Sequence, residues 1–282
     1  MNGLLNKIFS DKIVKRVMTL FTGSALGAIV YFLFQPLITR IYSPEELGVY
    51  AFIFSIVTMF STVINGHYDL AIVSAGSDEE ADKLAVVSFL FSIILIVFIG
   101  IVILFILFIF PERLQEANWW TLFACLFLLI FSVNNILISY NNRYLQYKLI
   151  SRVNIYKNSA RALLQVVFGL FKLGFFGILL GNLIGYLVGV RTQSKFINGD
   201  YKRFTIYKLK DIKIVAKKYY KQPLFSAPGL FFVAASNSII AFYIGVLYGA
   251  EELGYYFLSI NILSIPISLI SSNMGKVFFK SA

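Results

Sequence analysis

The chain has 282 residues, of which 59% are hydrophobic and only 14% are charged, against about 25% charged in a soluble domain. The charges are clustered and leave uncharged runs of about 20 residues, the length that a helix needs to cross a bilayer. A soluble globular protein is therefore excluded. The runs lack the period-2 alternation of a transmembrane barrel strand, which excludes that class as well.

These runs predict an all-α polytopic membrane protein with about eight transmembrane helices. Residues 1–16 are expected to be a cytoplasmic tail, 17–196 a complete six-helix lobe, 197–221 a basic amphipathic linker, and 222–282 the start of a second lobe. In chain order, the predicted spans are 17–39, 47–73, 84–110, 118–139, 153–172, 174–194, 222–247 and 252–275.

The distribution of basic residues predicts the orientation. With a cytoplasmic N-terminus, 20 of the 25 Lys and Arg residues fall on the inner side. The outer loops carry only Arg40, Arg113 and Lys172, and the remaining two cations lie within the fifth span. Such a bias is typical of a cytoplasmic N-terminus. The net charge of +11 thus follows from topology, and we expect no nucleic-acid partner.

The second span begins with a phrase that the chain repeats. Residues 42–50 read YSPEELGVY and residues 248–256 read YGAEELGYY, at an offset of 206. In the first copy, Ser43 and Glu46 are predicted to form a capping box, with Pro44 at the first helical position. Both copies are predicted on the outer side, which indicates a parallel repeat of one bundle, a common arrangement in transporters.

The polar residues of the second span also recur. Ser55, Thr58, Thr62, Asn65 and Asp69 are predicted to share one helix face. The eighth span has polar residues at four of the five positions that lie 206 residues later. Because the first lobe has six predicted spans and the second only two, we expect the second lobe to be truncated, with about four or more spans missing.

The fifth span contains the candidate binding residues. A charge in the middle of a span costs about 2.5–3.5 kcal/mol on insertion scales, so Arg161 is expected to face a cavity or a partner. Its guanidinium would suit a phosphate or diphosphate, and pairing with Asp69 or with backbone carbonyls is the alternative. On or beside the same face lie Asn154, Lys157, Asn158, Gln165 and Lys172.

Three further features carry weaker signals. Five glycines in the sixth span predict close helix contact. Cys125 and His67 are the only residues of their kinds, so we expect no metal site. His67 and Asp69 are candidates for ion coupling or an ion pair. The linker is amphipathic and could lie on anionic inner-leaflet lipids or simply join the two bundles.

Several of these segments resemble bacterial polysaccharide flippases, the exporters of lipid-linked oligosaccharide for O-antigen and capsule. The resemblance rests on QPLITRIYSPEELGVYA (35–51), GHYDLAIV (66–73), SDEEA (77–81) and SRVN (151–154). It places the chain in the superfamily that also holds multidrug exporters and the lipid II flippase. It implies two six-helix lobes around a central cavity. Arg40 and Arg152 match basic positions of the family pattern and Asp69 an acidic one, whereas His67 departs from a common arginine.

We therefore predict a flippase rather than an enzyme. It would move undecaprenyl-diphosphate-linked oligosaccharide from the inner to the outer leaflet of the bacterial inner membrane by alternating access. The predicted contacts are Arg40, Arg152 and Arg161 for the diphosphate, and the polar stripes of spans two, five and eight for the sugar. Expected partners include the polysaccharide polymerase and chain-length machinery, and no cofactor is expected beyond a coupling proton or sodium ion. A multidrug or small-cation exporter and a membrane enzyme of polysaccharide assembly are the alternatives.

Overall fold

The computed structural model describes residues 11–109, 119–194 and 207–263, and every regular element in these ranges is helical. Five helices within this part are long and apolar enough to cross a membrane. The predicted all-α polytopic membrane protein is confirmed. The elements are α2 (Asp11–Ile41), α3 (Pro44–Ser61), α4 (Tyr68–Ser74), α5 (Asp78–Ile109), η1 (Trp119–Leu122), α6 (Phe123–Arg143), α7 (Tyr147–Leu170), α8 (Phe175–Ser194), α10 (Leu209–Lys218), the π-turn η3 (Gln222–Ser226), α11 (Ala227–Leu247) and a final helix over 250–263.

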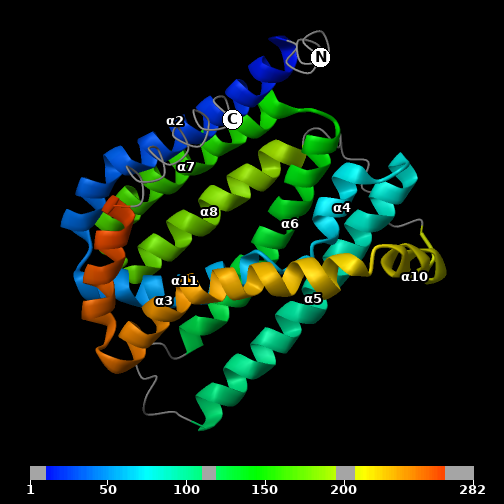
Figure 1. Ribbon diagram of the computed structural model, residues 1–282. Helices are drawn as coiled ribbons and strands as arrows, with labels where there is room; N and C mark the ends of the chain where they lie inside the picture. Colours follow the sequence, from blue (N-terminus) through cyan, green and yellow to red (C-terminus); the bar gives the residue numbers. More distant parts are fainter. Residues whose placement is uncertain (1–10, 110–118, 195–206, 264–282) are drawn as a thin grey trace, which may run out of the picture.

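The helices α2 to α8 form one lobe, in which α2, α7 and α8 lie side by side (Figure 1). The main core lies where α3 and α6 pack under this layer, around Tyr50, Ile53, Phe127 and Leu128. We call the end of the bundle that bears α10 the basic end. The opposite end, where α2 passes into α3, is the Tyr42 end.

Glycines bring α2 and α8 into backbone contact with α7. A Cβ on Gly27 of α2 would lie 2.7 Å from the carbonyl oxygen of Asn154. On α8, a Cβ at Gly181 would lie 2.8 Å from the backbone nitrogen of Gln165, and one at Gly185 would lie 3.0 Å from the carbonyl oxygen of Lys157. The glycine face predicted for the sixth span is thus confirmed as a close helix contact, which only small residues allow.

The predicted second span is not one continuous helix. It divides into α3 and α4, with residues 62–67 forming turns between them. Gly66 and His67 both have φ of 58°, the left-handed conformation that cannot continue a right-handed helix. The five polar residues predicted on one face are therefore split. Ser55 and Thr58 lie on α3, whereas Asn65 lies in the turn and Asp69 on α4.

The start of α3 has the predicted capping box. The Ser43 hydroxyl accepts from the Glu46 amide, and the Glu46 carboxylate accepts from the Ser43 amide at 2.9 Å. Tyr42, just before the cap, is buried and donates its hydroxyl to the Gln165 carbonyl at 2.7 Å. In the second copy of the phrase, Gly249 takes the cap position with φ of 96°, and Tyr248 is 72% exposed.

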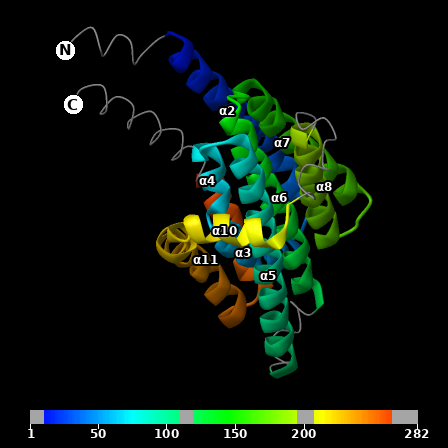
Figure 2. The same cartoon turned by 90° about the vertical axis from the view of Figure 1, so that its right-hand side faces the viewer.

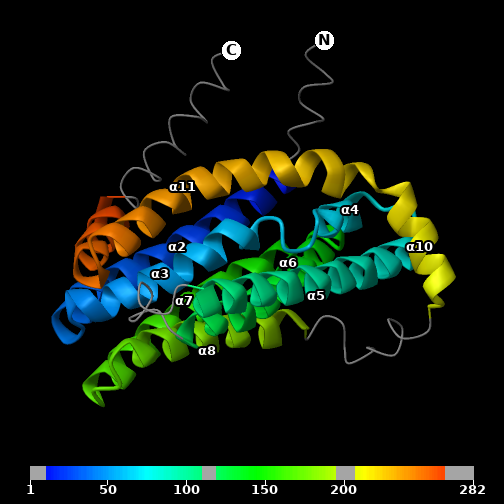
Figure 3. The ribbon, with the colours of Figure 1, turned by 90° about the horizontal axis from the view of Figure 1, so that it is seen from below.

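The helix α10 lies across the basic end, over the ends of α4 and α5 (Figures 2 and 3). Its Ile212 and Val215 are buried against Tyr68, Leu84 and Tyr140 in a second core cluster. The apolar side predicted to face lipid is thus largely covered by protein. Leu209, the first residue of the same helix, is 71% exposed.

Polar contacts hold α10 and Tyr207, two residues before it, to α5. Lys218 of α10 pairs with Glu80, and the Tyr207 hydroxyl donates to the Asp82 carboxylate at 3.2 Å. The contact with the Lys218 ammonium lowers the pKa of the Glu80 carboxyl below its ordinary value. The predicted linker helix is therefore docked on the first lobe.

The glycine contacts of α8 predict a sharp difference between two of its glycines. Gly181→Ala is expected to destabilise the lobe by about 1–3 kcal/mol, because its methyl group would meet the backbone of α7. Gly189→Ala on the same helix is the matched control, because its nearest neighbours are 3.6 Å away on the flexible Lys157 side chain. The measurement is the thermal midpoint of purified protein in detergent. Equal midpoints for the two variants would contradict the close contact.

The Glu80–Lys218 contact predicts a pH-dependent attachment of α10. A carboxyl whose pKa is lowered on folding stabilises the docked state above its unfolded pKa of about 4.3, and this contribution is lost as pH falls through the folded pKa. Glu80→Gln should therefore raise the rate of tryptic cleavage in α10 roughly two- to fivefold at neutral pH, as expected for an exposed ion pair. Hydrogen exchange of the α10 amides extends the comparison to pH 4. The difference in exchange rate between Glu80→Gln and the wild type should be smaller there than at neutral pH.

The control for this prediction is Glu79→Gln. Glu79 pairs with Lys83 four residues along the same helix, and no hydrogen bond or ion pair joins its carboxylate to α10 in the described part of the chain. If both variants change cleavage and exchange equally, Glu80 does not hold α10.

Candidate functional site

A cavity of about 510 Å³ lies between the lobe of α2 to α8 and two helices that follow α10, namely α11 and the helix over 250–263. Three helices form its wall: α3, α11 and the helix over 250–263. This size is typical of a ligand pocket. Its polar lining residues are Ser55, Thr58, Thr62, Asn237, Ser238, Tyr256 and Asn261.

The cavity confirms one part of the predicted repeat. Ser55, Thr58 and Thr62 of span two share its wall with Asn261 of span eight, which lies 206 residues after Ser55. Asn237 and Ser238 of α11 complete the polar lining, and the Thr58 and Ser238 hydroxyls lie 3.2 Å apart. Asn261 thus faces the same space as the polar residues of span two, whereas the later positions of the predicted stripe, Ser264, Ser268 and Ser271, lie outside the described residues.

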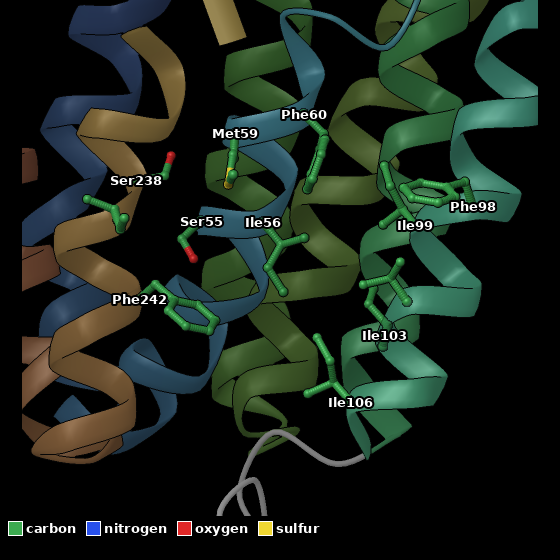
Figure 4. Close-up of a pocket in the computed structure, with 12 residues that line it drawn as sticks. Ser55, Ile56, Met59, Phe60, Phe98, Ile99, Ile103, Ile106, Ser238 and Phe242 are labelled. Carbon is green, nitrogen blue, oxygen red and sulfur yellow. The ribbon is translucent and has the colours of Figure 1, made fainter. Parts of the chain in front are cut away.

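An apolar groove of about 360 Å³ adjoins this cavity. It lies between α3, α5 and α11, and Ser55 and Ser238 line both spaces (Figure 4). The remaining lining residues are apolar, and Phe98 and Phe242 at the rim are 62% and 42% exposed. A cavity with hydroxyl and amide groups on part of its wall and an apolar groove thus meet at two serines.

The two cations of span five lie elsewhere, on the far side of Tyr50. The Arg161 guanidinium lies 3.9 Å from the centre of the Tyr31 ring and donates to the Tyr31 hydroxyl at 2.9 Å and the Tyr50 hydroxyl at 3.4 Å. One turn earlier, the Lys157 ammonium lies 4.8 Å from the centre of the Tyr186 ring. Neither cation pairs with a carboxylate in the part of the chain that the structure describes. Tyrosine hydroxyls and rings are their partners.

Amides complete this cluster, which comprises Lys157, Arg161, Tyr31, Tyr50, Tyr186, Asn182 and Gln165. Asn182 donates to the Tyr50 hydroxyl at 2.5 Å, and Gln165 donates to the Ile178 carbonyl at 3.3 Å. The side-chain oxygens of both amides and Nε of Arg161 are buried without a hydrogen-bond partner. We call this group the cation–tyrosine cluster.

The cluster touches the cavity wall only through Tyr50. The Tyr50 ring stacks on Phe54 at 5.4 Å and meets Phe257 edge-on at 5.6 Å, and both phenylalanines line the cavity. Arg161 itself is not a lining residue. The polar stripe of span five, predicted to line the sugar path, is instead packed between α2 and α8.

The other candidate contacts are dispersed. Asn154 donates to Ser24 of α2 at 3.0 Å, and Asn158 lies against Gly27 of the same helix. Arg152 is exposed toward the basic end of α7, whereas Arg40 is exposed at the Tyr42 end of α2. These two arginines therefore lie at opposite ends of the bundle, and the structure does not bring them together with Arg161.

Asn65 belongs to a polar network inside the first lobe. Its amide nitrogen donates to the Ser132 hydroxyl at 2.8 Å and to the Ser88 carbonyl at 3.4 Å, and its oxygen accepts from Asn135 at 3.4 Å. Asn65 is 1% exposed, so the break after α3 turns it away from the cavity. The predicted contact with substrate does not fit this position.

His67 and Asp69 lie close together around the start of α4. His67 is 5% exposed in the left-handed conformation, and both ring nitrogens lack a hydrogen-bond partner. Asp69 is half-buried and forms no ion pair with Arg161. A role in ion coupling stays a prediction for both residues.

Sequence reasoning missed the tyrosines of the cation–tyrosine cluster and the polar residues of α11. Tyr31, Tyr50 and Tyr186 come from three helices, so no local spacing connects them with Arg161. Ser236, Asn237 and Ser238 are consecutive within an otherwise apolar run, and consecutive residues point to different faces of a helix, so they define no stripe. Their polarity within a span was the one available signal.

Comparison with known proteins identifies the family. A family model described as polysaccharide biosynthesis protein matches residues 37–282. Among solved structures, the chain resembles a MATE transporter, ClbM in complex with Rb+, with a TM-score of 0.40 at 12% identity over 89% of this chain and 66% of that one. So distant a likeness carries no information on ions or substrates. No curated protein matches the chain in sequence. The family match spans most of the chain, which therefore belongs to the polysaccharide biosynthesis protein family.

Proposed function

We propose that the protein is a membrane transporter that moves a lipid-linked oligosaccharide, carried on an undecaprenyl diphosphate, toward the outer leaflet. The observation that carries this proposal is the pair of adjoining spaces between the lobes. The cavity offers hydroxyl and amide groups, which suit a sugar, and the groove beside it is apolar. An amphiphilic substrate needs both environments in contact.

Charge supports an anionic substrate over a cationic one. No Asp, Glu, Lys or Arg lines either space within the described residues, so the walls are neutral. Two cations, Arg161 and Lys157, lie behind Tyr50 and pair with no carboxylate among the described residues. In a low-dielectric interior, two positive charges act over longer distances than in water and would favour a diphosphate in the cavity. An exporter of cations gains no support from this arrangement.

The orientation follows from the basic residues. We place the basic end, with α10 and its lysines, in the cytoplasm of a bacterial inner-membrane protein, and the Tyr42 end outside. Arg152 then lies exposed at the cytoplasmic end of α7 and would meet the diphosphate as it enters. Arg40 lies exposed at the outer end of α2 and would meet it as it leaves.

Three components of the proposal extend beyond the cavity. Lys213 and Lys217 of α10 are exposed and would contact anionic lipids of the inner leaflet. The product would pass to the polysaccharide polymerase and chain-length machinery. His67 and Asp69 are the residues that would sense a coupling proton or sodium ion.

Export of surface polysaccharide tests the role of Arg161. Both Arg161→Ala and Arg161→Lys should lower export, the first by more than tenfold, because the charge-assisted bonds and ring contact of a guanidinium are not reproduced by an ammonium. The assay measures surface polysaccharide per cell in a host that depends on the protein, with protein amounts checked by immunoblot. Arg191→Ala is the control, because Arg191 is an exposed cation at the end of α8.

Tyr31→Phe separates an electrostatic role from a structural one. It removes the hydroxyl that accepts from Arg161 and keeps the ring beneath the guanidinium. If the charge acts on the substrate, this variant should lose far less export than Arg161→Ala, because the guanidinium keeps its charge, its bond to the Tyr50 hydroxyl and its ring contact. Wild-type export from both Arg161 variants at normal protein amounts would contradict the proposed role.

A further inference from the structure

The two copies of the repeated phrase contact each other at the Tyr42 end. Their helices, α3 and the one over 250–263, both begin there and cross near their first turns. A Cβ on Gly48 would lie 1.7 Å from the carbonyl oxygen of Ala250, and a Cβ on Gly254 would lie 1.8 Å from the carbonyl oxygen of Pro44. The two backbones are therefore in direct contact at two glycines.

This contact has local twofold symmetry. Ala250 is the repeat counterpart of Pro44, and Gly254 is the counterpart of Gly48, at the same offset of 206. Each glycine thus packs on the carbonyl that begins the opposite copy. A reciprocal contact of this kind is what a twofold axis between two equal segments produces. The axis runs along the bundle, because both helices start at the same end.

The crossing lies directly at one end of the cavity. Ala51, three residues after Gly48, and Leu253, directly before Gly254, line the cavity and are buried together with Phe52. Gly245 of α11 packs on the same group, since a Cβ there would lie 2.9 Å from Phe52 and 3.0 Å from Leu253. The polar lining begins beyond this apolar layer, at Ser55 and Thr58. Two glycines and an apolar layer therefore separate the cavity from the Tyr42 end.

We infer that the Gly48–Gly254 crossing is a gate, whose opening connects the cavity with the outer side. The proposed export function gives this gate its direction, because a substrate leaving toward the Tyr42 end must pass between the two copies. The contact suits a gate, since it comprises bare backbone and a few apolar side chains. Neither an ion pair nor a side-chain hydrogen bond joins the two copies among the described residues.

A single methyl group should hold the gate open. A Cβ keeps about 3.0 Å from such an oxygen, so Gly48→Ala or Gly254→Ala requires the helices to move apart by more than 1 Å. The substitution acts against the closed state alone and so shifts the population toward the open one. The matched control is Gly229→Ala on α11, where a Cβ would meet nothing within 4 Å.

Thiol accessibility tests the gate without relying on transport. In a Cys125→Ser chain, Thr58→Cys places a reporter in the cavity, and a membrane-impermeant thiosulfonate is added to the outside of spheroplasts. The reporter should react about tenfold faster in Gly48→Ala and Gly254→Ala than in Gly229→Ala. Equal rates in all three, at equal protein amounts, would overturn the inference.

The double variant gives a second, independent criterion. A single movement of the two helices apart makes room for both methyl groups. The fold increase in the reaction rate of the reporter in Gly48→Ala/Gly254→Ala should therefore be smaller than the product of the fold increases in the two single variants. A fold increase in the double variant equal to that product would show that the two glycines act at separate contacts, which would exclude a single gate.

A cross-link tests the same gate without substituting either glycine. Ala51→Cys/Leu253→Cys, bridged by a short bifunctional thiol reagent, should stop surface polysaccharide export, whereas each single cysteine treated in the same way should not. Normal export from the bridged protein would overturn the gate. If export is absent from every variant while accessibility changes as expected, the gate stands and the proposed substrate fails.

Discussion

Direct contact between helix backbones is the constraint on which the rest of this structure depends. Lipid tails are as apolar as leucine, so burial of apolar side chains does little to join helices within a membrane, and close packing takes its place. Gly27 and Gly181 bring α2 and α8 onto opposite sides of α7, and Gly48 and Gly254 bring the two copies of the repeated phrase together. The same kind of contact thus builds the first lobe and joins it to the second.

Packing α7 between two helices determines the environment of its cations. Arg161 and Lys157 would be costly in lipid, and the layer places three tyrosines from α2, α3 and α8 around them. Rings and hydroxyls stabilise the two charges without neutralising them. The lobe therefore keeps a positive charge behind Tyr50, while the wall of the cavity in front of it remains neutral.

The first and second halves use the repeated phrase differently. Tyr42 is buried against the glycines of α7 and α8, whereas Tyr248, its counterpart, is exposed. Ser43 caps its helix with a side chain, whereas its counterpart Gly249 has no side chain for this purpose and has φ of 96°. In both copies the helix starts at the same place and has a glycine one turn later. Those are the features that the crossing requires, because each glycine packs on the carbonyl that begins the opposite copy.

Sequence by itself determined the class of protein, the position of most spans, the capping box at Ser43 and the small-residue face of α8. Each of these depends on residues close together in the chain, or on an apolar run long enough to cross a bilayer. The tertiary structure alone decided which face of each span meets the cavity. The turn at Gly66 and His67 moved Asn65 into the lobe, and the glycines of two neighbouring helices enclosed the polar side of α7. A helical period shows that polar residues share a face, but the direction of that face depends on contacts between helices that are far apart in sequence.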